Sequence, residues 1–320
     1  MIRTTVVIPN YNGIKYIENC LKSILSSTVD VKVLVIDNGS TDGSKELVKS
    51  SFGHVEMVEM DKNTGFCHAC NVGIEKSDTE FVMLLNNDTE ILSDTIEKLE
   101  RDMDEYPHAL SFQAKMVSMS NPDLTDSAGD YYCAFGWAFA IGKDKPSLNY
   151  SGKRRIFSGC GGATIYRKSV LNSIGFLDEN HFAYLEDVDL GYRGNIEGYT
   201  NYVDEDAVVL HAGSAFSGSR YNEFKVSLSS KNSIYLIYKN MPFIQIILLL
   251  PFLLIGYLIK IVFFLKKGLG RTYVKGLGAG FRLSLSEEGK KHKVKFRVKN
   301  LLNYVVLHFV LIVNIFRRLG

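Results

Sequence analysis

Short apolar runs alternate with amphipathic stretches along the first half of the chain. Residues 4–9, 31–36 and 81–85 are largely apolar over five or six positions, and residues 54–60 alternate between apolar and polar side chains. Compact apolar runs of this length are typical of strands that are buried on both faces of a parallel sheet. We therefore expect four strands in this part of the chain.

The segments between these runs carry helical spacing. After the first run, apolar residues recur three or four positions apart, at Ile14, Ile17, Leu21, Ile24 and Leu25. Helices are also predicted from Thr41 and Asp42 onward, which supply a plausible N-cap, and over residues 66–75. Strand–helix units with short connections predict an α/β fold, with a mostly parallel sheet covered by helices on both faces.

A second block of elements follows a long irregular stretch. Residues 118–157 show weak periodicity and many turn formers, and they contain the single tryptophan, Trp137. We interpret this stretch as an excursion over the edge of the sheet, where selectivity for an acceptor can reside. Beyond it, strands are predicted over residues 164–167 and 203–210, and a helix is predicted to start at Glu186.

Polar side chains follow three of the predicted strands at the point where each strand ends. The turn Asn10, Tyr11 and Asn12 follows the first strand, Asp37 follows the second, and Asp88 follows the strand over residues 81–85. Because ligands of parallel α/β sheets bind beyond the carboxyl ends of the strands, these side chains are expected to converge on one site. For Asp88 alone, the competing interpretation is a helix cap or a turn former.

Composition and charge narrow the class of partner. A hydrophobic content of 46% with 22% charged residues is typical of a globular protein. Fourteen of the 37 Lys and Arg residues, but only two of the 35 acidic residues, lie at or after Lys260, so the preceding part carries a net charge of about −10. An acidic body argues against nucleic acid as a partner, whereas a basic tail beside apolar runs fits an anionic membrane surface.

Two apolar runs near the end of the chain raise the question of a membrane. Residues 241–265 reach spanning length but are interrupted by Pro251, Gly256 and Lys260, and residues 301–316 are short for a span. If the first run crossed the membrane, the basic stretch between the runs would lie outside, against the positive-inside tendency. We therefore expect an interfacial or re-entrant attachment on the cytosolic face, with helices packed on a soluble protein as the alternative.

The cysteines suggest no disulfide framework. There are five of them, scattered along the chain, and no signal peptide precedes the first strand, so a cytosolic catalytic part is expected. Cys67 and Cys70 have the spacing of a redox or zinc pair, but no second ligand pair accompanies them, and a structural role is favoured. The glycine-rich segment 158–162 lacks the lysine of a P-loop, so close approach to a sugar is favoured over a phosphate cradle.

Taken in order, several motifs resemble the family 2 glycosyltransferases. They are Val-Val-Ile-Pro-Asn-Tyr-Asn-Gly at residues 6–13, Val-Ile-Asp-Asn-Gly-Ser-Thr-Asp at 35–42, Asn-Thr-Gly-Phe at 63–66, Leu-Leu-Asn-Asn-Asp-Thr at 84–89, and Leu-Glu-Asp-Val-Asp-Leu at 185–190, followed by His211. The resemblance covers about residues 3–240 and is greatest to the rhamnosyltransferase-like branch that builds bacterial surface polysaccharides. It implies the GT-A fold.

The resemblance also implies a role for each motif. Asp37 would contact the uracil or thymine ring of the donor, and the nucleotide side would comprise Pro9, Tyr11, Asn12, Asp37, Asn63, Gly65, Asn71, Asn86 and Asn87. Asp88 and His211 would hold the metal, and Asp187 would be the catalytic base, with Glu186 orienting the acceptor. Relatives carry Asp-X-Asp where this chain has Asn86 first, so Asp88 is the single carboxylate of the motif.

The chemistry of sugar transfer calls for these residue types. A nucleoside diphosphate that leaves gathers negative charge, which a divalent cation stabilises. Mg²⁺ prefers one or two carboxylates plus substrate phosphates, and a histidine ligand favours Mn²⁺. The acceptor hydroxyl needs a base, and Glu186 and Asp187 start a predicted helix, whose dipole is expected to keep both ionised. On that helix, Asp189 and Arg193 are expected to form a structural ion pair.

These observations predict an inverting transferase that moves a single sugar from a UDP- or dTDP-linked donor to a lipid-linked glycan. Its catalytic domain is expected over residues 1–215, a helical connector over 216–240 and a membrane-associating region over 241–320. The Gln-X-X-Arg-Trp signature of processive polysaccharide synthases does not occur. A non-catalytic scaffold of an envelope-assembly complex is the alternative, and the intact Asp37, Asp88 and Asp187 argue against it.

Overall fold

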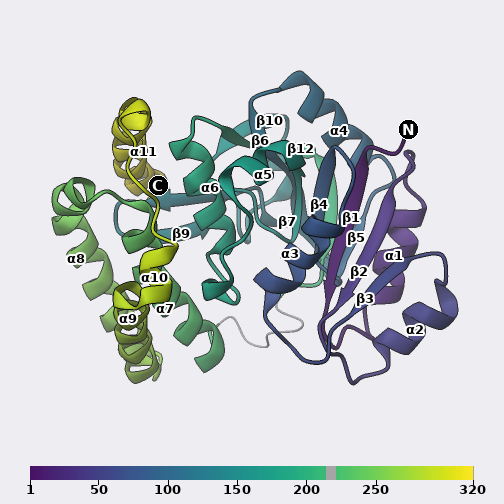
Figure 1. The fold of residues 1–320 in the computed structure, drawn as a ribbon, viewed down its shortest axis with the longest axis horizontal. Helices are drawn as coiled ribbons and strands as arrows, with labels where there is room; N and C mark the ends of the chain where they lie inside the picture. The colour runs from purple at the N-terminus through teal and green to yellow at the C-terminus, as the bar shows by residue number, and fades with distance from the viewer. Residues whose placement is uncertain (214–220, 320) are drawn as a thin grey trace.

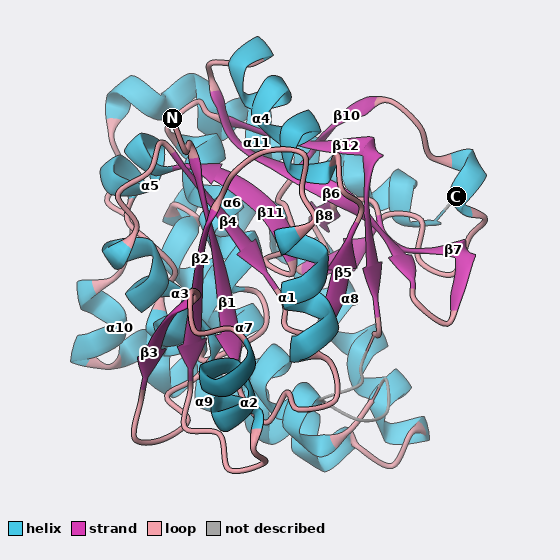
Figure 2. Ribbon diagram, turned by 90° about the vertical axis from the view of Figure 1, so that its right-hand side faces the viewer, coloured by secondary structure: helices cyan, strands magenta, loops and turns pink. Residues whose placement is uncertain are grey.

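The computed structural model describes residues 1–213 and 221–319 and is built around one large twisted sheet (Figures 1 and 2). Its strand order is β10-β12-β6-β11-β4-β1-β2-β3, with β5 beside β12 and β7 beside β6. The strands are β1 (Thr4–Asn10), β2 (Lys32–Asp37), β3 (Glu56–Glu59), β4 (Phe81–Leu85), β5 (Thr89–Ile91), β6 (Ala109–Ser118), β7 (Asn121–Ser127), β10 (Lys153–Ile156), β11 (Ala163–Arg167) and β12 (Thr200–His211).

The half of the sheet that contains the first four predicted strands is parallel. Strand β1 pairs in parallel with β2 and with β4, and β2 pairs in parallel with β3. Strand β11 is antiparallel to both of its neighbours and joins this half to the parallel pair β6 and β12. The predicted α/β class with a parallel sheet at its centre is therefore confirmed, and the antiparallel strands are an addition to it.

Helices cover both faces of the sheet, as predicted, because alternate residues of its central strands point to opposite sides. Val6 and Ile8 of β1 pack with helices on one face, and Val7 between them packs with helices on the other. In Figure 1, α1 and α3 accordingly lie on opposite sides of β1 and β4. The helices of this part are α1 (Ile17–Leu25), α2 (Ser44–Ser51), α3 (Phe66–Lys76), α4 (Thr95–Glu105), α5 (Lys168–Ile174) and α6 (Glu186–Ile196).

Two local predictions need correction. The first helix starts at Ile17, and Ile14 is exposed, because the backbone forms a turn there in which Tyr16 and Ile17 donate to the carbonyl of Gly13. After Asp88 the chain forms the short strand β5, not a helix turn, because residues 89–91 pair with β12. The helix-cap interpretation of Asp88 is therefore wrong.

The stretch over residues 118–157 is more regular than its weak periodicity suggested. It contributes β7 and β10 to the large sheet and forms a separate hairpin from β8 (Asp130–Cys133) and β9 (Trp137–Ala140). The strands are short and half-buried, and therefore they carry little periodic signal. The hairpin extends away from the sheet, toward the helices that follow residue 221.

The C-terminal helices pack on this hairpin and on α6, at the end of the molecule opposite β3 (Figure 1). They are α7 (Glu223–Asn240), α8 (Phe243–Lys266), α9 (Gly270–Leu285), α10 (Glu287–Lys291) and α11 (Leu301–Leu319). The predicted boundary between residues 215 and 216 lies outside the described residues. Two of these helices, α8 and the segment 298–319 around α11, are long and apolar enough to cross a membrane.

A buried group of charges joins α6 to α7. The Asp189 carboxylate, fully buried, accepts hydrogen bonds from Arg193 Nε at 3.0 Å, Lys239 Nζ at 2.8 Å and Asn240 Nδ2 at 2.8 Å. Burial acts to raise the pKa of Asp189, but Lys239 and Arg193 outweigh it and lower the pKa below its ordinary value. The predicted pair of Asp189 and Arg193 is therefore confirmed, and Lys239 is the partner that sequence spacing did not indicate.

Replacing Lys239 by methionine is expected to destabilise the fold by about 3–5 kcal/mol, since it leaves two buried carboxylates short of a partner. Lys239 Nζ also lies 2.7 Å from Asp178 Oδ2. Chemical unfolding followed by circular dichroism measures the loss. The matched control is Lys32→Met, which removes an exposed ion pair with Asp78 and should change stability little. Equal losses in both variants would contradict this assignment.

Candidate active site

The ends of β1 and β2 form the nucleotide side of the predicted site. Asn10 Nδ2 donates to Asp37 Oδ1 at 3.0 Å and to Ser44 Oγ at 2.9 Å, and Asn87 Nδ2 donates to Asn10 Oδ1 at 2.7 Å. Asp37 is fully buried, and its second oxygen accepts from the backbone N–H of Ser40. Residues from three strand ends therefore meet here, as the sequence predicts.

Two neighbouring predicted residues, Asn12 and Asn63, hold loops at this edge. Asn12, at φ +52°, accepts from the backbone N–H of Thr41 at 2.8 Å. Asn63 Oδ1 accepts from the backbone N–H of Gly65 at 2.9 Å. Tyr11 and Pro9 are half-buried in the first of these strand ends. The roles of all five residues toward a nucleotide stay predictions.

Asn71 is the predicted nucleotide residue that lies elsewhere. Its Nδ2 donates to the carbonyl of Leu177 at 2.9 Å and to Glu179, and its Oδ1 accepts from the backbone N–H of Leu177 at 3.0 Å. Both ends of this side chain are thus occupied in tying α3 to the segment before α6. The structure does not bring it to Asn10 and Asp37.

The turn between β4 and β5 brings Asp88 to His211. Asp88 is buried, and its Oδ1 lies 3.4 Å from His211 Nε2. Residues 89–91 pair with 209–211 of β12, which places His211 opposite Thr89, next to Asp88. The two predicted metal ligands, 123 positions apart in sequence, therefore lie side by side. Asn86 precedes them in the turn, and its backbone N–H donates to the carbonyl of Gly162.

Asp126 completes this group from the end of β7. His211 Nδ1 lies 2.9 Å from Asp126 Oδ2, and Asp126 also pairs with Lys143. Burial would lower the pKa of His211, but the carboxylates of Asp126 and Asp88 outweigh it and raise the pKa to about 9. Burial would raise the pKa of Asp126, but His211 and Lys143 lower it to about 2. The group thus concentrates two carboxylates around one cationic side chain.

The donor set of this group fits a divalent cation. A carboxylate and an imidazole nitrogen side by side are suitable ligands for Mn²⁺. A metal-binding histidine commonly directs its other ring nitrogen to a carboxylate, which fixes the orientation of the ring. Asp126 stands in that relation to His211. Asp88 and His211 would hold the ion, and Asp126 would orient His211.

Asp187 and Glu186 occupy different environments at the start of α6. Asp187 is half-buried and accepts from the backbone N–H of Val188 at 2.7 Å, and the backbone N–H of Gly161 also lowers its pKa. Glu186 is buried, and its Oε2 finds no hydrogen-bond partner among the described residues. Only one of the two carboxylates is therefore open to a ligand, in line with the angular separation of neighbouring helical residues.

The expectation that the helix start keeps both carboxylates ionised is wrong. Burial is the largest influence and raises the pKa of Asp187 to about 6, against the lowering effect of the two N–H donors. Burial, together with the charge of Asp187, raises the pKa of Glu186 well above its ordinary value. Desolvation of a carboxylate outweighs the partial charge of a helix terminus here.

Two further groups surround Asp187. Asp130 of β8 and Cys160 bring a ligand atom each to within 4.8 Å of one another and of Asp187. A thiolate is needed to bind a metal, and burial raises the pKa of the Cys160 thiol well above its ordinary value, so this group suits a cation poorly. Burial, followed by the charge of Asp187, raises the pKa of Asp130 well above its ordinary value, and the two carboxylates form an acidic wall of the site.

The sequence analysis missed Asp126 and Asp130. Both lie in the turn Asp-Ser-Ala-Gly-Asp at residues 126–130, inside the stretch of weak periodicity. Gly129 has φ +96°, and a Cβ there would meet Ile156 at 2.5 Å, so this tight turn requires glycine. The sequence feature that could have indicated Asp126 and Asp130 was a pair of acidic residues on either side of a turn of small residues. The turn connects the histidine group to the acidic wall.

The glycine-rich segment 158–162 lies between the motif of Asp88 and the base. The carbonyl of Gly162 accepts from the backbone N–H of Asn86 at 3.0 Å. Close approach to a sugar stays a prediction for this segment. The Cys67 and Cys70 thiols are buried, all five cysteines are free, and burial raises the pKa of both thiols well above the ordinary value, which supports the structural interpretation.

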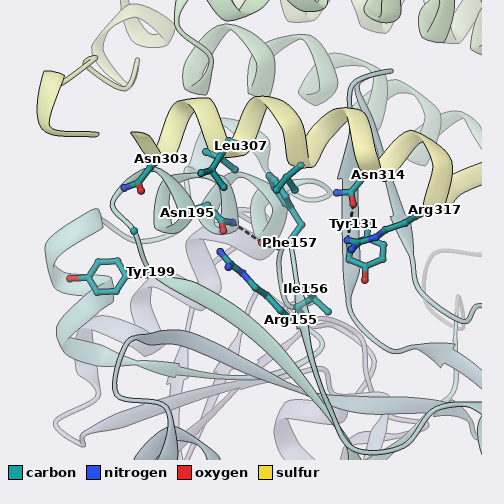
Figure 3. Close-up of a pocket in the computed structure, with 13 residues that line it drawn as sticks. Tyr131, Arg155, Ile156, Phe157, Asn195, Tyr199, Asn303, Leu307, Asn314 and Arg317 are labelled. Atoms are coloured by element: carbon teal, nitrogen blue, oxygen red, sulfur yellow. Dashed lines mark hydrogen bonds between the residues drawn. The ribbon is translucent and has the colours of Figure 1, made fainter. Parts of the chain in front are cut away.

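A cavity of about 220 Å³ lies apart from these residues, beneath α11 (Figure 3). Tyr131, Arg155 and Arg317 line it, together with apolar residues of α11. Figure 3 shows Arg155 on the wall opposite the helix, and Arg317 at the helix end beside Tyr131. None of the predicted site residues lines this cavity.

Comparison with known proteins places the chain among sugar transferases. The model of glycosyl transferase family 2 matches residues 5–175, more than half of the chain. The glycosyltransferase AglE of Haloferax volcanii is 25% identical over 277 residues, which cover 84% of this chain and 85% of the relative. An N-acetylglucosaminyl-diphospho-decaprenol L-rhamnosyltransferase of Mycobacterium tuberculosis is 25% identical over 232 residues, 64% of this chain and 75% of the relative.

Other matches are partial. Two bacterial relatives match over 98 and 133 residues, and these spans cover only 14% and 18% of the relatives' own lengths. The chain therefore corresponds to a small part of those larger proteins.

Solved structures share the fold. Staphylococcus aureus TarS 1–349, in complex with UDP-GlcNAc, superposes with a TM-score of 0.60 at 17% identity, over 97% of this chain and 90% of TarS. A mannosyltransferase from Pyrobaculum calidifontis, in complex with GDP-Man and Mn²⁺, gives 0.54 at 16% identity, over 96% and 87% of the two chains. At this identity the likeness concerns the fold, which is GT-A.

Replacing Asp126 by asparagine is expected to weaken Mn²⁺ binding about 10- to 100-fold, the usual effect of losing a carboxylate behind a metal-binding histidine. Isothermal titration with Mn²⁺ in the presence of UDP measures it. Asp123→Asn, at an exposed position of the same strand β7, is the control and should leave the affinity unchanged. Unchanged binding in Asp126→Asn would show that Asp126 does not support the metal site.

Proposed function

The chain belongs to glycosyl transferase family 2, whose model matches more than half of it, and from this premise we propose that it transfers a single sugar from a nucleoside diphosphate to an acceptor hydroxyl. The donor is a UDP- or dTDP-linked sugar, and the acceptor is a lipid-linked glycan of cell-surface polysaccharide synthesis. The observation that carries the proposal is the placement of Asp187. It is the half-open carboxylate of the pair at the start of α6, and the backbone N–H of Val188 donates to it at 2.7 Å.

The donor binds along the ends of β1, β2 and β4 in this proposal. Asp37, buried and already bonded to Asn10, gives a rigid acceptor for the base of the nucleotide, with Tyr11 and Asn12 beside it. Asp88 and His211, 3.4 Å apart, would hold Mn²⁺ or Mg²⁺, and the cation would supply positive charge to stabilise the leaving diphosphate. The glycine-rich segment between Asn86 and Asp187 admits the sugar because it carries few side chains.

The reaction itself is a single displacement. Asp187 removes the proton of the acceptor hydroxyl while the hydroxyl oxygen attacks the anomeric carbon, and the bond from that carbon to the diphosphate breaks with its electron pair. A pKa of about 6 leaves Asp187 mostly ionised at neutral pH yet more basic than an exposed aspartate. Attack opposite the leaving group inverts the anomeric centre. Glu186, neutral in its buried position, orients the acceptor side.

A non-catalytic scaffold remains the alternative function. It would need neither an open carboxylate at the start of α6 nor the histidine group on β12. The structure supports catalysis over the scaffold because buried carboxylates with raised pKa values destabilise a fold and are retained where chemistry uses them.

Replacing Asp187 by asparagine is expected to lower transfer by at least about 100-fold while binding of nucleotide in the presence of metal survives. Turnover is followed by release of UDP or dTDP from UDP-glucose, UDP-galactose, UDP-GlcNAc and dTDP-L-rhamnose, with membrane extract as acceptor. Affinity for UDP with Mn²⁺ is measured by titration. Asp189→Asn is not a suitable control because it disturbs the buried ion pairs. The control is Asp144→Asn, because Asp144 lies in an exposed turn. Transfer at the wild-type rate by Asp187→Asn would show that Asp187 is not the catalytic base.

The C-terminal helices attach the enzyme to the cytosolic face of a membrane in this proposal. Many apolar side chains of α8 and α11 are exposed, among them Phe243, Ile244, Leu248, Leu302 and Phe309, and basic residues flank both helices. Apolar surface beside clustered Lys and Arg fits an anionic interface.

Contacts in the middle of α8 favour an interfacial helix over a spanning one. Trp137 Nε1 of the β8–β9 hairpin donates to the carbonyl of Gly256 at 3.2 Å, and a Cβ at Gly256 would meet the carbonyl oxygen of Phe135 at 2.3 Å. A helix that crossed the bilayer would carry this hairpin, and the turn at Asp130 behind it, to the centre of the hydrocarbon. Polar backbone without partners is costly there.

The double variant Ile244→Glu and Leu248→Glu is expected to reduce co-sedimentation with phosphatidylglycerol vesicles about tenfold or more, since it buries charge in the interface. Leu148→Glu is the control, because Leu148 is an apolar residue on the catalytic body that is even more exposed than Ile244 and Leu248. Equal binding of all three proteins would contradict the assignment of this surface. Labelling of a cysteine introduced at Lys290 from outside intact cells would exclude a cytosolic position for the basic stretch.

A further inference from the structure

The turn that leads into the catalytic helix has a strained backbone. Phe182, Tyr184 and Leu185 have φ values of +66°, +70° and +69°, a region that residues with a side chain rarely occupy. Such conformations cost on the order of 1–3 kcal/mol each, so they persist only where surrounding contacts hold them. Glu186 and Asp187 follow at once. The position of the proposed base therefore depends on what holds this turn.

Asn232 of α7 makes the contacts that hold it. Its Nδ2 donates to the carbonyls of His181 at 3.0 Å, Ala183 at 2.9 Å and Tyr184 at 2.7 Å. The side chain is fully buried, so water does not compete for these bonds. Without the amide, three carbonyls of a left-handed turn would lose a donor inside the protein, at a cost that favours a relaxed backbone.

We propose that Asn232 is a positioning residue of the transfer reaction: it clamps the strained turn over residues 181–185 and thereby places Asp187 against the acceptor hydroxyl. This inference rests on the proposed function of Asp187. Asn232 lies beyond the part of the chain that the family model matches, which ends at residue 175, and it acts through the backbone of the turn.

Helix α7 makes hydrogen bonds to residues before and after Asp187 at the start of α6. Asn232 binds the turn before Asp187, and two turns further along α7 Lys239 and Asn240 bind Asp189 after it. Lys231 adds a bond from its Nζ to the carbonyl of Asn180 at 2.8 Å. The base therefore sits on a segment that is fixed on either side by one rigid helix, which is the arrangement that precise placement of a reacting group requires.

Helix α9 fixes α7 in turn. A Cβ at Gly276 would meet Ser230 Oγ at 1.8 Å, and a Cβ at Gly280 would meet the carbonyl oxygen of Lys231 at 2.4 Å. These two glycines let α9 approach the backbone of α7 directly beside Asn232. The helices that follow the catalytic domain thus support the base as well as offering the apolar surface.

The turn also reaches the nucleotide side. The carbonyl of Phe182 accepts from the backbone N–H of Cys67 at 3.2 Å, and a Cβ at Gly65 would lie 2.6 Å from the Phe182 ring. A shift of the turn would move Asp187 directly, because Asp187 follows the turn in the chain. Asn10 and Asp37 lie on other strands and would move less. This difference separates a positioning role from a general structural one.

The test compares Asn232→Ala and Asn232→Ser with Asn314→Ala. Asn314 is also fully buried and donates to one backbone carbonyl, that of Tyr132 at 2.8 Å, from α11. Hydrolysis of the donor that the wild-type protein turns over, with water in place of the acceptor, gives kcat and KM. We expect kcat to fall about 10- to 100-fold in Asn232→Ala, less in Asn232→Ser, which retains one donor, and little in Asn314→Ala.

Two readouts distinguish positioning from loss of structure. The KM for donor and the affinity for UDP with Mn²⁺ should stay within about twofold of wild type. The pH profile of kcat should also move: wild-type activity rises with pH through the pKa of Asp187, about 6. If the turn relaxes and Asp187 becomes more exposed to water, the burial that raises its pKa is reduced, so the midpoint shifts to lower pH.

The Asn232 substitutions leave the titratable groups that face Asp187 chemically unchanged. They are Glu186 on its own helix, Asp130 of β8, and Cys160 and Tyr166 on the segment before and within β11. A shifted midpoint therefore reports the position of Asp187 and not a change in its neighbours' identity.

Wild-type kcat and pH profile in Asn232→Ala would overturn the inference. A parallel loss of kcat, donor KM and UDP affinity in both Asn232 variants would overturn it too, in favour of a general structural role. If Asn232→Ala does not fold, Asn232→Ser carries the same comparison. Failure of the wild-type protein to hydrolyse any of the four nucleotide sugars would instead count against the proposed function.

Discussion

The buried carboxylate of Asp189 is the interaction on which the arrangement of this molecule depends. Asp189 lies two residues after the proposed base, Asp187. It accepts hydrogen bonds from Arg193 on its own helix and from Lys239 and Asn240 on α7. A buried charge is tolerated only when its partners remain in place, because each lost partner leaves an unpaired charge in a poorly solvated interior. The catalytic helix and the first C-terminal helix are therefore bound to move as one body.

Acidic residues crowd this end of the sheet, and three different environments keep them compatible. Cations neutralise Asp189 and Asp178, and the pKa of each is lowered accordingly. The His211 side chain lies between Asp88 and Asp126. Burial without a cation raises the pKa of Glu186 and Asp187. Environments that push the pKa values of neighbouring carboxylates apart suit them to different tasks, here a structural anchor and the proposed metal ligand and base.

The β8–β9 hairpin links these tasks to the apolar helices. It starts at Asp130, beside Asp187, and its far end packs on α8 through Phe135 and Trp137. An acceptor with a lipid tail needs its hydroxyl at the base and its tail at the interface at the same time. The hairpin connects these two places, because Asp130 lies beside Asp187 and the far end of the hairpin packs on α8.

Much of the site was predictable because its residues follow strands whose apolar runs are unmistakable. Asp37 and Asp88 end such runs, parallel strands end at a common edge, and the motifs around Glu186 and Asp187 mark the base. Asp126 and Asp130 were not predictable in the same way, since they lie in short half-buried strands without a periodic signal. Asn71 has the residue type of a ligand-binding side chain, but its partner, Leu177, lies 106 positions away and became visible only in the fold.

The amino-acid sequence by itself determined the order of the elements, the parallel core and the identity of the carboxylates. These depend on local spacing and on which side chains avoid water. The tertiary structure decided which of the carboxylates are charged, since burial outweighed the helix dipole at Glu186, and which distant residues hold them. Lys239 and Asn232 lie about fifty positions after the groups they bind. No local pattern marks such a partner, because its role arises only when two helices are packed together.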